Sequence, residues 1–217
     1  MVRKKMSVKK FDLRLLISTI LKLIILLTCI YSAVNLKWTV FFYSIFVLIL
    51  TFVPAIIKKN FKVNIPSELE FLFISFIYMS LFLGEIKFYF LKFWWWDLLL
   101  HTFSGIALGF IGLILIYIVY SQNKIKSNYI FLAVFAFCFA LSIGAIWEIF
   151  EFGMDQMFGF NMQKSGLVDT MSDLIVDSIG ALLTSIYAYF YFKFNHKNKI
   201  GELTESFVNE NKKLYRQ

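Results

Sequence analysis

The chain has 217 residues, of which 59% are hydrophobic and 20% are aromatic, and its formal net charge is +8. A soluble domain carries about 45–50% apolar residues, so this composition excludes an ordinary soluble fold and indicates a membrane protein. The positive charge does not indicate nucleic-acid binding, because the basic residues gather beside the ends of apolar segments. The predicted partner is the lipid bilayer.

Six apolar segments approach the roughly 20 residues that a helix needs to cross a bilayer. They cover residues 13–34, 40–57, 71–90, 96–120, 129–152 and 168–192. The predicted fold is therefore all-α: a polytopic membrane protein built as a bundle of six transmembrane helices.

The segments divide the chain into three expected parts. Residues 1–66 hold a basic N-terminal segment and the first two helices, residues 67–194 form a four-helix core with the functional site, and residues 195–217 form a polar tail. The start of the chain is interpreted as a first helix rather than a signal peptide, because its apolar run is too long and no A-x-A cleavage site follows.

The distribution of basic residues predicts the orientation. With a cytoplasmic N-terminus, 17 of the 22 Lys and Arg residues lie inside, and only Lys37, Lys87, Lys92 and Lys164 lie outside. The positive-inside rule then predicts a multi-pass cell-membrane protein with both termini in the cytoplasm. Lys22 is expected to snorkel to the inner headgroups.

Aromatic and sulfur-containing side chains add little chemistry. Trp94, Trp95 and Trp96 are expected to form an aromatic anchor at the outer interface. Cys29 and Cys138 lie in different apolar segments without metal-binding or disulfide spacing, so both are predicted to be packing residues. His196 in the tail is expected to be solvated.

The acidic residues gather on the predicted outer side. Eight of the 14 Asp and Glu residues lie there: Glu85, Asp97, Glu148, Glu151, Asp155, Asp169, Asp173 and Asp177. A charged residue at the centre of a membrane helix costs roughly 2.5–3.5 kcal/mol, so these acids are not expected to face lipid.

Helical periodicity places the acids on three stripes that continue into small residues. The stripes are Asp97, His101, Gly105, Gly109 and Gly112; Ala140, Gly144, Glu148, Glu151 and Asp155; and Asp169, Asp173, Asp177, Gly180, Ala181 and Thr184. Small residues allow membrane helices to approach closely. We therefore expect the stripes to face one another, closed by small residues at mid-membrane and opening outward into an acidic pocket.

Clustered carboxylates in such a pocket need protons or a bound cation. Carboxylate oxygens with one imidazole suit Mg²⁺, Mn²⁺ or Zn²⁺. The predicted ligands of a divalent metal ion are His101, Glu148, Asp169, Asp173 and Asp177. Glu151 and Asp97 are the candidate catalytic residues, as general bases for water.

Several acids also have structural interpretations. Asp169 is a candidate N-cap for the last helix, Asp155 is expected to be solvated, and Glu85 is favoured as an ion-pair partner of Lys87 or Lys92. Glu148 and Glu151 could instead hydrogen-bond to a neighbouring helix.

The stretches "WWWDLLLHTFSGIALGF", "GAIWEIFEFGMD" and "GLVDTMSDLIVDSIGALL" resemble the YjdF-like family of prokaryotic integral membrane proteins and, more loosely, the VanZ-like family. The resemblance covers about residues 80–185 and implies a membrane-embedded site. Its matching positions are Asp97, His101, Glu148, Glu151, Asp169, Asp173, Gly180 and Ala181. The last VanZ-like motif usually holds an Asn and a basic residue, whereas this chain has Asp177 and no nearby Arg, so no antibiotic-resistance role is carried over.

Two functional hypotheses follow. The first is a metal-dependent membrane hydrolase or transferase whose outward pocket acts on a lipid-linked, envelope or other small-molecule substrate. The alternative is a cation- or proton-binding transport or sensing protein. Against transport, the acidic stripes stop halfway across the membrane. A purely structural partner of another membrane protein would not require so many acids in one place.

Overall fold

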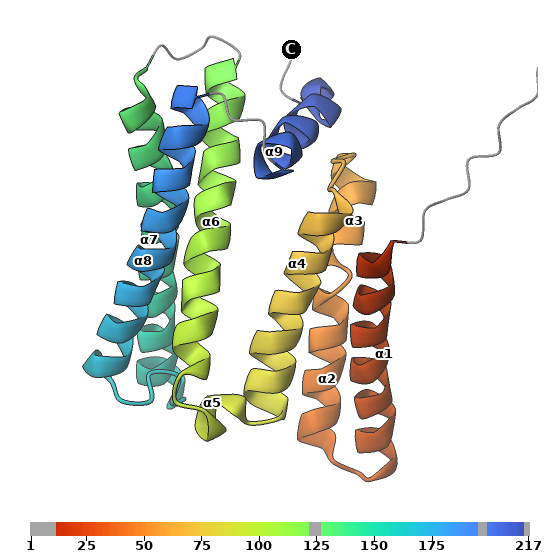
Figure 1. Ribbon diagram of the computed structural model, residues 1–217. Helices are drawn as coiled ribbons and strands as arrows, with labels where there is room; N and C mark the ends of the chain where they lie inside the picture. Colours follow the sequence, from red (N-terminus) through yellow and green to blue (C-terminus); the bar gives the residue numbers. More distant parts are fainter. Residues whose placement is uncertain (1–11, 122–126, 195–198, 215–217) are drawn as a thin grey trace, which may run out of the picture. The chain divides into compact units, whose positions relative to one another are not determined.

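The computed structural model describes residues 12–121, 127–194 and 199–214, and the regular elements in these ranges are all helices. Six helical stretches are long and apolar enough to cross a membrane: Leu13–Val34, Trp38–Phe61, Ser67–Ile86, Trp96–Tyr120, Tyr129–Phe158 and Leu167–Phe194. The predicted all-α fold with six spans is confirmed (Figure 1). His196 and most of the predicted inner-side basic residues near the N-terminus and around residue 124 lie outside the described ranges.

The first three spans form one compact unit, which ends at Lys87. Its helices, red to yellow in Figure 1, are α1 (Leu13–Val34), α2 (Trp38–Leu50), α3 (Val53–Phe61), α4 (Ser67–Ile77) and the π-helix η1 (Tyr78–Ile86). Helix α1 packs along α2 and α4, and η1 packs against α2. Ile25, Val47 and Phe82 form the buried core where these helices meet.

Charged residues mark one end of this unit. Arg14 pairs with Glu68, and the Lys58 ammonium lies 2.5 Å from a carboxylate oxygen of Glu70. These pairs join the start of α1, the end of α3 and the start of α4, so the three helix ends lie together. The Lys22 ammonium lies 4.7 Å from the centre of the Phe52 ring, in a cation–π contact.

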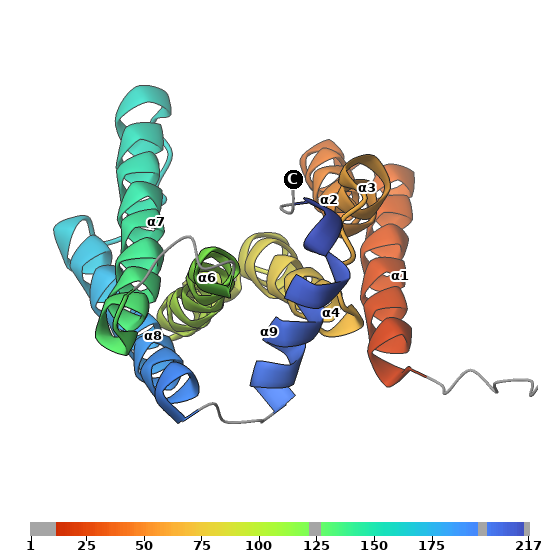
Figure 2. The ribbon, with the colours of Figure 1, turned by 90° about the horizontal axis from the view of Figure 1, so that it is seen from above.

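The remaining spans form a second compact unit, which begins at Phe88. Its elements, green to blue in Figure 1, are α5 (Tyr89–Lys92), α6 (Trp96–Ser121), α7 (Tyr129–Phe158), α8 (Leu167–Phe194), α9 (Lys199–Glu210) and a 3₁₀ turn, η2 (Lys212–Leu214). Helices α6, α7 and α8 all pack against one another. Helix α9, which follows α8 and is seen from above in Figure 2, packs against α6.

The sequence analysis predicts that residues 67–194 form one core. In the structure the third span packs with the first two, and the division falls after Lys87. The break has a local cause, because Phe88 has a left-handed backbone conformation (φ +59°) that interrupts the helix and turns the chain into α5. Glu85 therefore belongs to the first unit.

Two other local predictions need correction. Trp96 is buried, with its ring centre 5.0 Å from that of Tyr89, whereas Trp94 is exposed, so the three tryptophans do not form one exposed group. Cys29 is buried in α1, as expected of a packing residue, but Cys138 is exposed on α7.

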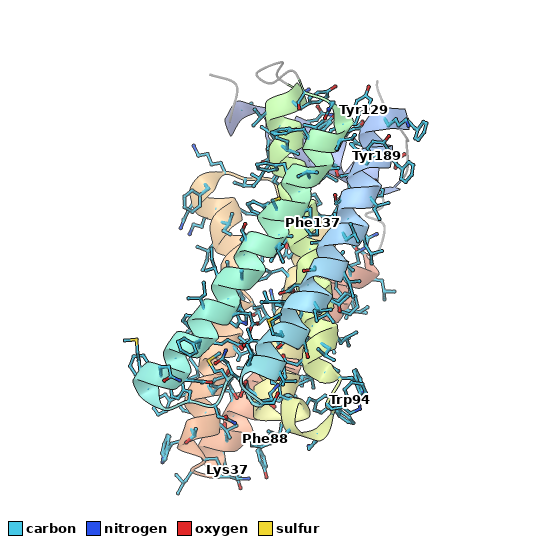
Figure 3. All side chains as sticks on the ribbon, turned by 90° about the vertical axis from the view of Figure 1, so that its left-hand side faces the viewer. Lys37, Phe88, Trp94, Tyr129, Phe137 and Tyr189 are labelled. Carbon is cyan, nitrogen blue, oxygen red and sulfur yellow. The ribbon has the colours of Figure 1, made fainter. Side chains whose placement is uncertain are left out.

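The two ends of the second unit differ in character. Figure 3 looks onto α7 and α8, with Trp94 near one end of the unit and Tyr129 and Tyr189 near the other. At the Tyr129 end the core is apolar, formed by Leu113, Ala133, Ala136, Ala188 and Tyr191. The buried acids lie toward the Trp94 end, Glu148 in the last three turns of α7 and Asp173 and Asp177 in the first three turns of α8.

Glycines allow these three helices to approach closely, as the small-residue stripes predicted. A Cβ added at Gly180 would lie 2.5 Å from the Thr102 carbonyl oxygen, and one at Gly105 would lie 2.5 Å from that of Asp177. These are backbone atoms of the facing helix, which cannot rotate away. At Gly109 an added Cβ would meet the side chain of Thr184 at 2.7 Å. The α6–α8 crossing therefore requires glycine.

We expect Gly180→Ala to destabilise the second unit, because the added methyl group forces α6 and α8 apart. Overpacking of this kind costs about 1–3 kcal/mol. Thermal unfolding of the detergent-solubilised protein measures the loss. Gly153→Ala is the matched control, since nothing lies within 4 Å of its added Cβ, and equal stability of the two variants would contradict the packing assignment.

Candidate functional site

Four acidic side chains from three helices surround His101, which lies in the second turn of α6. Its Nε2 atom is 3.9 Å from Asp97 Oδ1, 3.8 Å from Glu148 Oε1 on α7, and 3.9 Å from Asp173 Oδ2 on α8. Its Nδ1 atom is 3.2 Å from Asp177 Oδ2. The stripes predicted from the sequence therefore do converge, and the imidazole is their common neighbour.

Asp177 differs from the other three acids because it approaches the opposite side of the imidazole ring. One of its oxygens is within hydrogen-bonding distance of His101 Nδ1, and the other accepts a hydrogen bond from the Ser104 hydroxyl at 2.9 Å. When Nδ1 carries the ring proton it donates to Asp177, and the lone pair of Nε2 then points toward Asp97, Glu148 and Asp173. Asp177 thus orients His101.

Three buried carboxylate oxygens on the Nε2 side have no hydrogen-bonding partner among the described residues. Glu148 and Asp173 are almost fully buried, at 3% and 1% exposure. Among the residues that the structure describes, neither oxygen of Glu148 nor Oδ2 of Asp173 has a hydrogen-bonding partner. Distances of 3.8–3.9 Å to Nε2 are too long for direct hydrogen bonds. Buried carboxylate oxygens normally have partners, so these oxygens need a proton, a water molecule or a cation.

Close helix packing positions these groups. An added Cβ at Gly144, one turn before Glu148 on α7, would lie 2.6 Å from Asp177 Oδ2. Any larger residue there would displace the carboxylate that orients His101. Gly105 and Gly180 likewise hold α6 against α8 beside Asp177. The small residues predicted to serve packing alone also set the geometry of the acidic cluster.

Asp97 is shared between the cluster and the loop that joins α7 to α8. Its Oδ1 faces His101, whereas its Oδ2 is paired with the ammonium of Lys164. The same ammonium lies 4.4 Å from the centre of the Phe90 ring. Asp97 is partly exposed, and it links His101 in the cluster to Lys164 in the connecting loop.

The α7–α8 loop is held by Asp155, and the prediction that this residue is solvated is wrong. Its two carboxylate oxygens accept hydrogen bonds from the backbone N–H groups of Met162 and Gln163, at 2.7 and 2.9 Å. The Gln163 amide also lies 2.5 Å from the Thr170 hydroxyl on α8. These bonds fix the residues that immediately precede Lys164.

The other two predicted site residues lie at the edge of the cluster. Helix α8 begins at Leu167, so Asp169 is its third residue and not its N-cap. One oxygen of Asp169 is buried and has no hydrogen-bonding partner in the described part of the chain. Glu151 accepts a hydrogen bond from the Trp147 indole N–H at 2.9 Å and is half-buried. Neither residue makes a direct contact with His101 that the structure resolves.

The geometry that fits a cation best uses the Nε2 side. One ligand atom each from Asp97, His101 and Asp173 can be chosen so that all three lie within 4.8 Å of one another. Glu148 Oε1 adds a fourth donor 3.8 Å from Nε2. Nitrogen and oxygen donors at this spacing can converge on one divalent ion after small adjustments.

Sequence reasoning missed two functional neighbours of the cluster. Ser104 lies three residues after His101, so helical spacing already placed it on the same face. Lys164 was noted only as an outer-side base, because its approach to Asp97 depends on how the loop folds. Asp97, in turn, was predicted as a general base, whereas its position beside Nε2 groups it with the candidate ligands.

We expect Asp173→Asn to stabilise the protein when metal has been removed by a chelator. The substitution removes one buried negative charge. It also adds an amide group whose N–H can donate hydrogen bonds to neighbouring carboxylate oxygens. A buried polar group without a hydrogen-bonding partner costs about 1–3 kcal/mol. Thermal unfolding after EDTA treatment measures the gain.

Asp155→Asn is the control for this experiment, and it should lower stability because it weakens the acceptor of two backbone N–H groups. If both variants lose stability to the same extent, Asp173 already has its charge compensated in the metal-free protein.

Comparisons with known proteins agree with the fold. The family model described as "Predicted membrane protein (DUF2238)" matches residues 17–194. A Thermotoga maritima protein described as "Uncharacterized protein" is 26% identical over 139 residues, covering 64% of this chain and 70% of the relative. No solved structure matches the chain. The family match includes all three helices of the acidic cluster, and the chain therefore belongs to DUF2238, the YjdF-like family of membrane proteins.

Proposed function

We propose that the second unit is a metal-dependent membrane hydrolase or transferase that acts on a lipid-linked or envelope substrate from the outer side of the membrane. The observation that carries the proposal is the set of unpartnered carboxylate oxygens around His101 Nε2. Both oxygens of Glu148 and Oδ2 of Asp173 are buried there without hydrogen-bonding partners among the described residues. A divalent cation would neutralise them in place.

The arrangement divides the predicted ligands into two groups. His101, Glu148, Asp173 and Asp97 would bind the ion, since their donor atoms lie on the Nε2 side. Asp177 would support the site through His101 Nδ1, in the way that carboxylates orient metal-binding histidines. Mixed oxygen and imidazole donors suit Mn²⁺ or Zn²⁺ better than Mg²⁺.

Glu151 is the candidate general base. It lies one turn from Glu148 on α7, and one of its oxygens is held by the Trp147 indole N–H. A carboxylate fixed through one oxygen keeps the other free to take a proton from water. A divalent ion bound at the site supplies a Lewis acid that polarises a phosphoryl or carbonyl oxygen. The Ser104 hydroxyl donates to Asp177, which in turn orients His101, so we assign Ser104 a positioning role and expect water or a substrate hydroxyl to be the nucleophile.

The position of the cluster favours a substrate anchored in the bilayer. Asp97, His101 and Asp173 lie within the first two turns of transmembrane spans, beside exposed apolar residues such as Phe103, Ile149 and Phe150. A lipid-linked substrate could present its polar group to this depth without leaving the membrane.

The alternative, a cation- or proton-transport protein, has less support. A transport path through the second unit would have to pass the apolar core at its other end, formed by Leu113, Ala133, Ala136, Ala188 and Tyr191. Intramembrane acids often mark ion paths, but in the described residues the buried acids stop before this core.

We expect the purified protein to bind one divalent metal ion, and His101→Ala and Asp173→Asn to abolish that binding. Asp177→Asn should weaken metal affinity about 10- to 100-fold without changing the stoichiometry, because it acts through His101. Metal analysis and Mn²⁺ titration in detergent provide both values.

The control is Glu202→Gln, which removes an exposed carboxylate on α9 and should leave metal binding unchanged. A wild-type protein that binds no divalent ion, together with proton-dependent cation flux in vesicles, would favour the transport alternative.

Orientation has a separate test. In a variant without Cys29 and Cys138, Ser165→Cys on the α7–α8 loop should react with a membrane-impermeant maleimide added to intact cells, and Lys59→Cys should not. Both positions are exposed. Labelling of Lys59→Cys alone would place the acidic cluster on the cytoplasmic side.

A further inference from the structure

The two oxygens of Asp97 face different groups. Its Oδ1 lies 3.9 Å from His101 Nε2, on the side of the proposed metal ion, and its Oδ2 is paired with the Lys164 ammonium. In two-metal centres, whose ions lie about 3.5–4 Å apart, a bridging carboxylate offers one oxygen to each ion. If the proposed ion binds on the Oδ1 side of Asp97, the Lys164 ammonium lies on the side where a second ion would bind.

The cluster holds more carboxylates than one divalent ion would neutralise. Six carboxylates come from the ends of α6, α7 and α8: Asp97, Glu148, Glu151, Asp169, Asp173 and Asp177. One divalent ion compensates only part of this charge. The buried oxygen of Asp169 has no hydrogen-bonding partner in the described ranges, and Asp169 lies five residues after Lys164, in the first turn of α8. The Lys164 ammonium is therefore placed among acids that a single ion at Nε2 would leave uncompensated.

The loop has contacts other than the ion pair. Asp155 already fixes the backbone at Met162 and Gln163, and Gln163 contacts Thr170. Lys164 also lies against the Phe90 ring. The Lys164–Asp97 pair is therefore one of several contacts of this loop, and it is the one that places a positive charge beside the cluster.

We propose that Lys164 is a tethered cation that fills the second position of a two-cation centre, with Asp97 as the bridging carboxylate. This inference rests on the proposed function, because the first position is that of the divalent ion. An ammonium carries one positive charge and has no open coordination position. Lys164 would therefore limit the centre to one divalent ion while still neutralising Asp97.

Mn²⁺ titration of the chelator-treated full-length protein tests this inference, with electron paramagnetic resonance as the readout. The wild type should bind one Mn²⁺ per chain and give the spectrum of an isolated ion. Lys164→Gln should bind two, and its spectrum should show coupling between neighbouring ions. Lys164→Arg should keep a stoichiometry of one, because a fixed positive charge remains.

Lys193→Gln is the matched control in the same unit, since the Lys193 ammonium pairs with the Tyr189 hydroxyl and should not affect Mn²⁺ binding. Lys164→Met, which keeps an apolar side chain against Phe90, replaces Lys164→Gln in this experiment if that variant does not fold. It should also bind two ions.

The outcomes separate the two proposals. One Mn²⁺ in both wild type and the Lys164 variants would overturn the tethered-cation inference and leave the metal-dependent function standing. Two Mn²⁺ in the wild type would also overturn it, because the second position would then be open in the presence of Lys164. No Mn²⁺ in any variant would remove the proposed function, and the inference with it.

Discussion

Negative charge held away from water is the constraint on which the second unit depends. Glu148, Asp173 and Asp177 are each buried to more than nine-tenths within membrane-spanning helices. Only Asp177 has hydrogen bonds to both of its oxygens, from Ser104 and His101. The low polarity of the surroundings makes every uncompensated oxygen expensive. The carboxylates have one imidazole as their common neighbour. A bound cation would neutralise their charge and so remove the cost of burying them.

Helix packing and site geometry are two consequences of the same residues. Gly105 and Gly180 allow the α6 and α8 backbones to meet at distances that a methyl group would prevent, and Gly144 leaves room for the Asp177 carboxylate. The apolar half of the unit, built around Leu113 and Tyr191, supplies stability without polar groups. One half therefore anchors the three helices, and the other presents charged side chains at fixed positions.

Much of this could be predicted from the sequence because it depends on periodicity. The lengths of the apolar segments predicted the six spans. The i,i+4 spacing placed Asp97 with His101 on one helix face, and Asp173 with Asp177 on another. Features that depend on backbone turns could not be predicted in this way. The left-handed Phe88 moved the boundary between units, and the loop geometry gave Asp155 two backbone donors and brought Lys164 to Asp97. The different roles of Asp173 and Asp177 depend on which imidazole nitrogen each one faces.

The most direct test of the central claim is a crystal structure of the Mn²⁺-loaded protein with anomalous diffraction data. We expect one anomalous peak within coordination distance of His101 Nε2 and of oxygens from Glu148 and Asp173, with Asp177 remaining on the Nδ1 side. Protein that diffracts well, with no peak at this position and with Glu148 and Asp173 hydrogen-bonded to ordered water or to each other, would contradict the account.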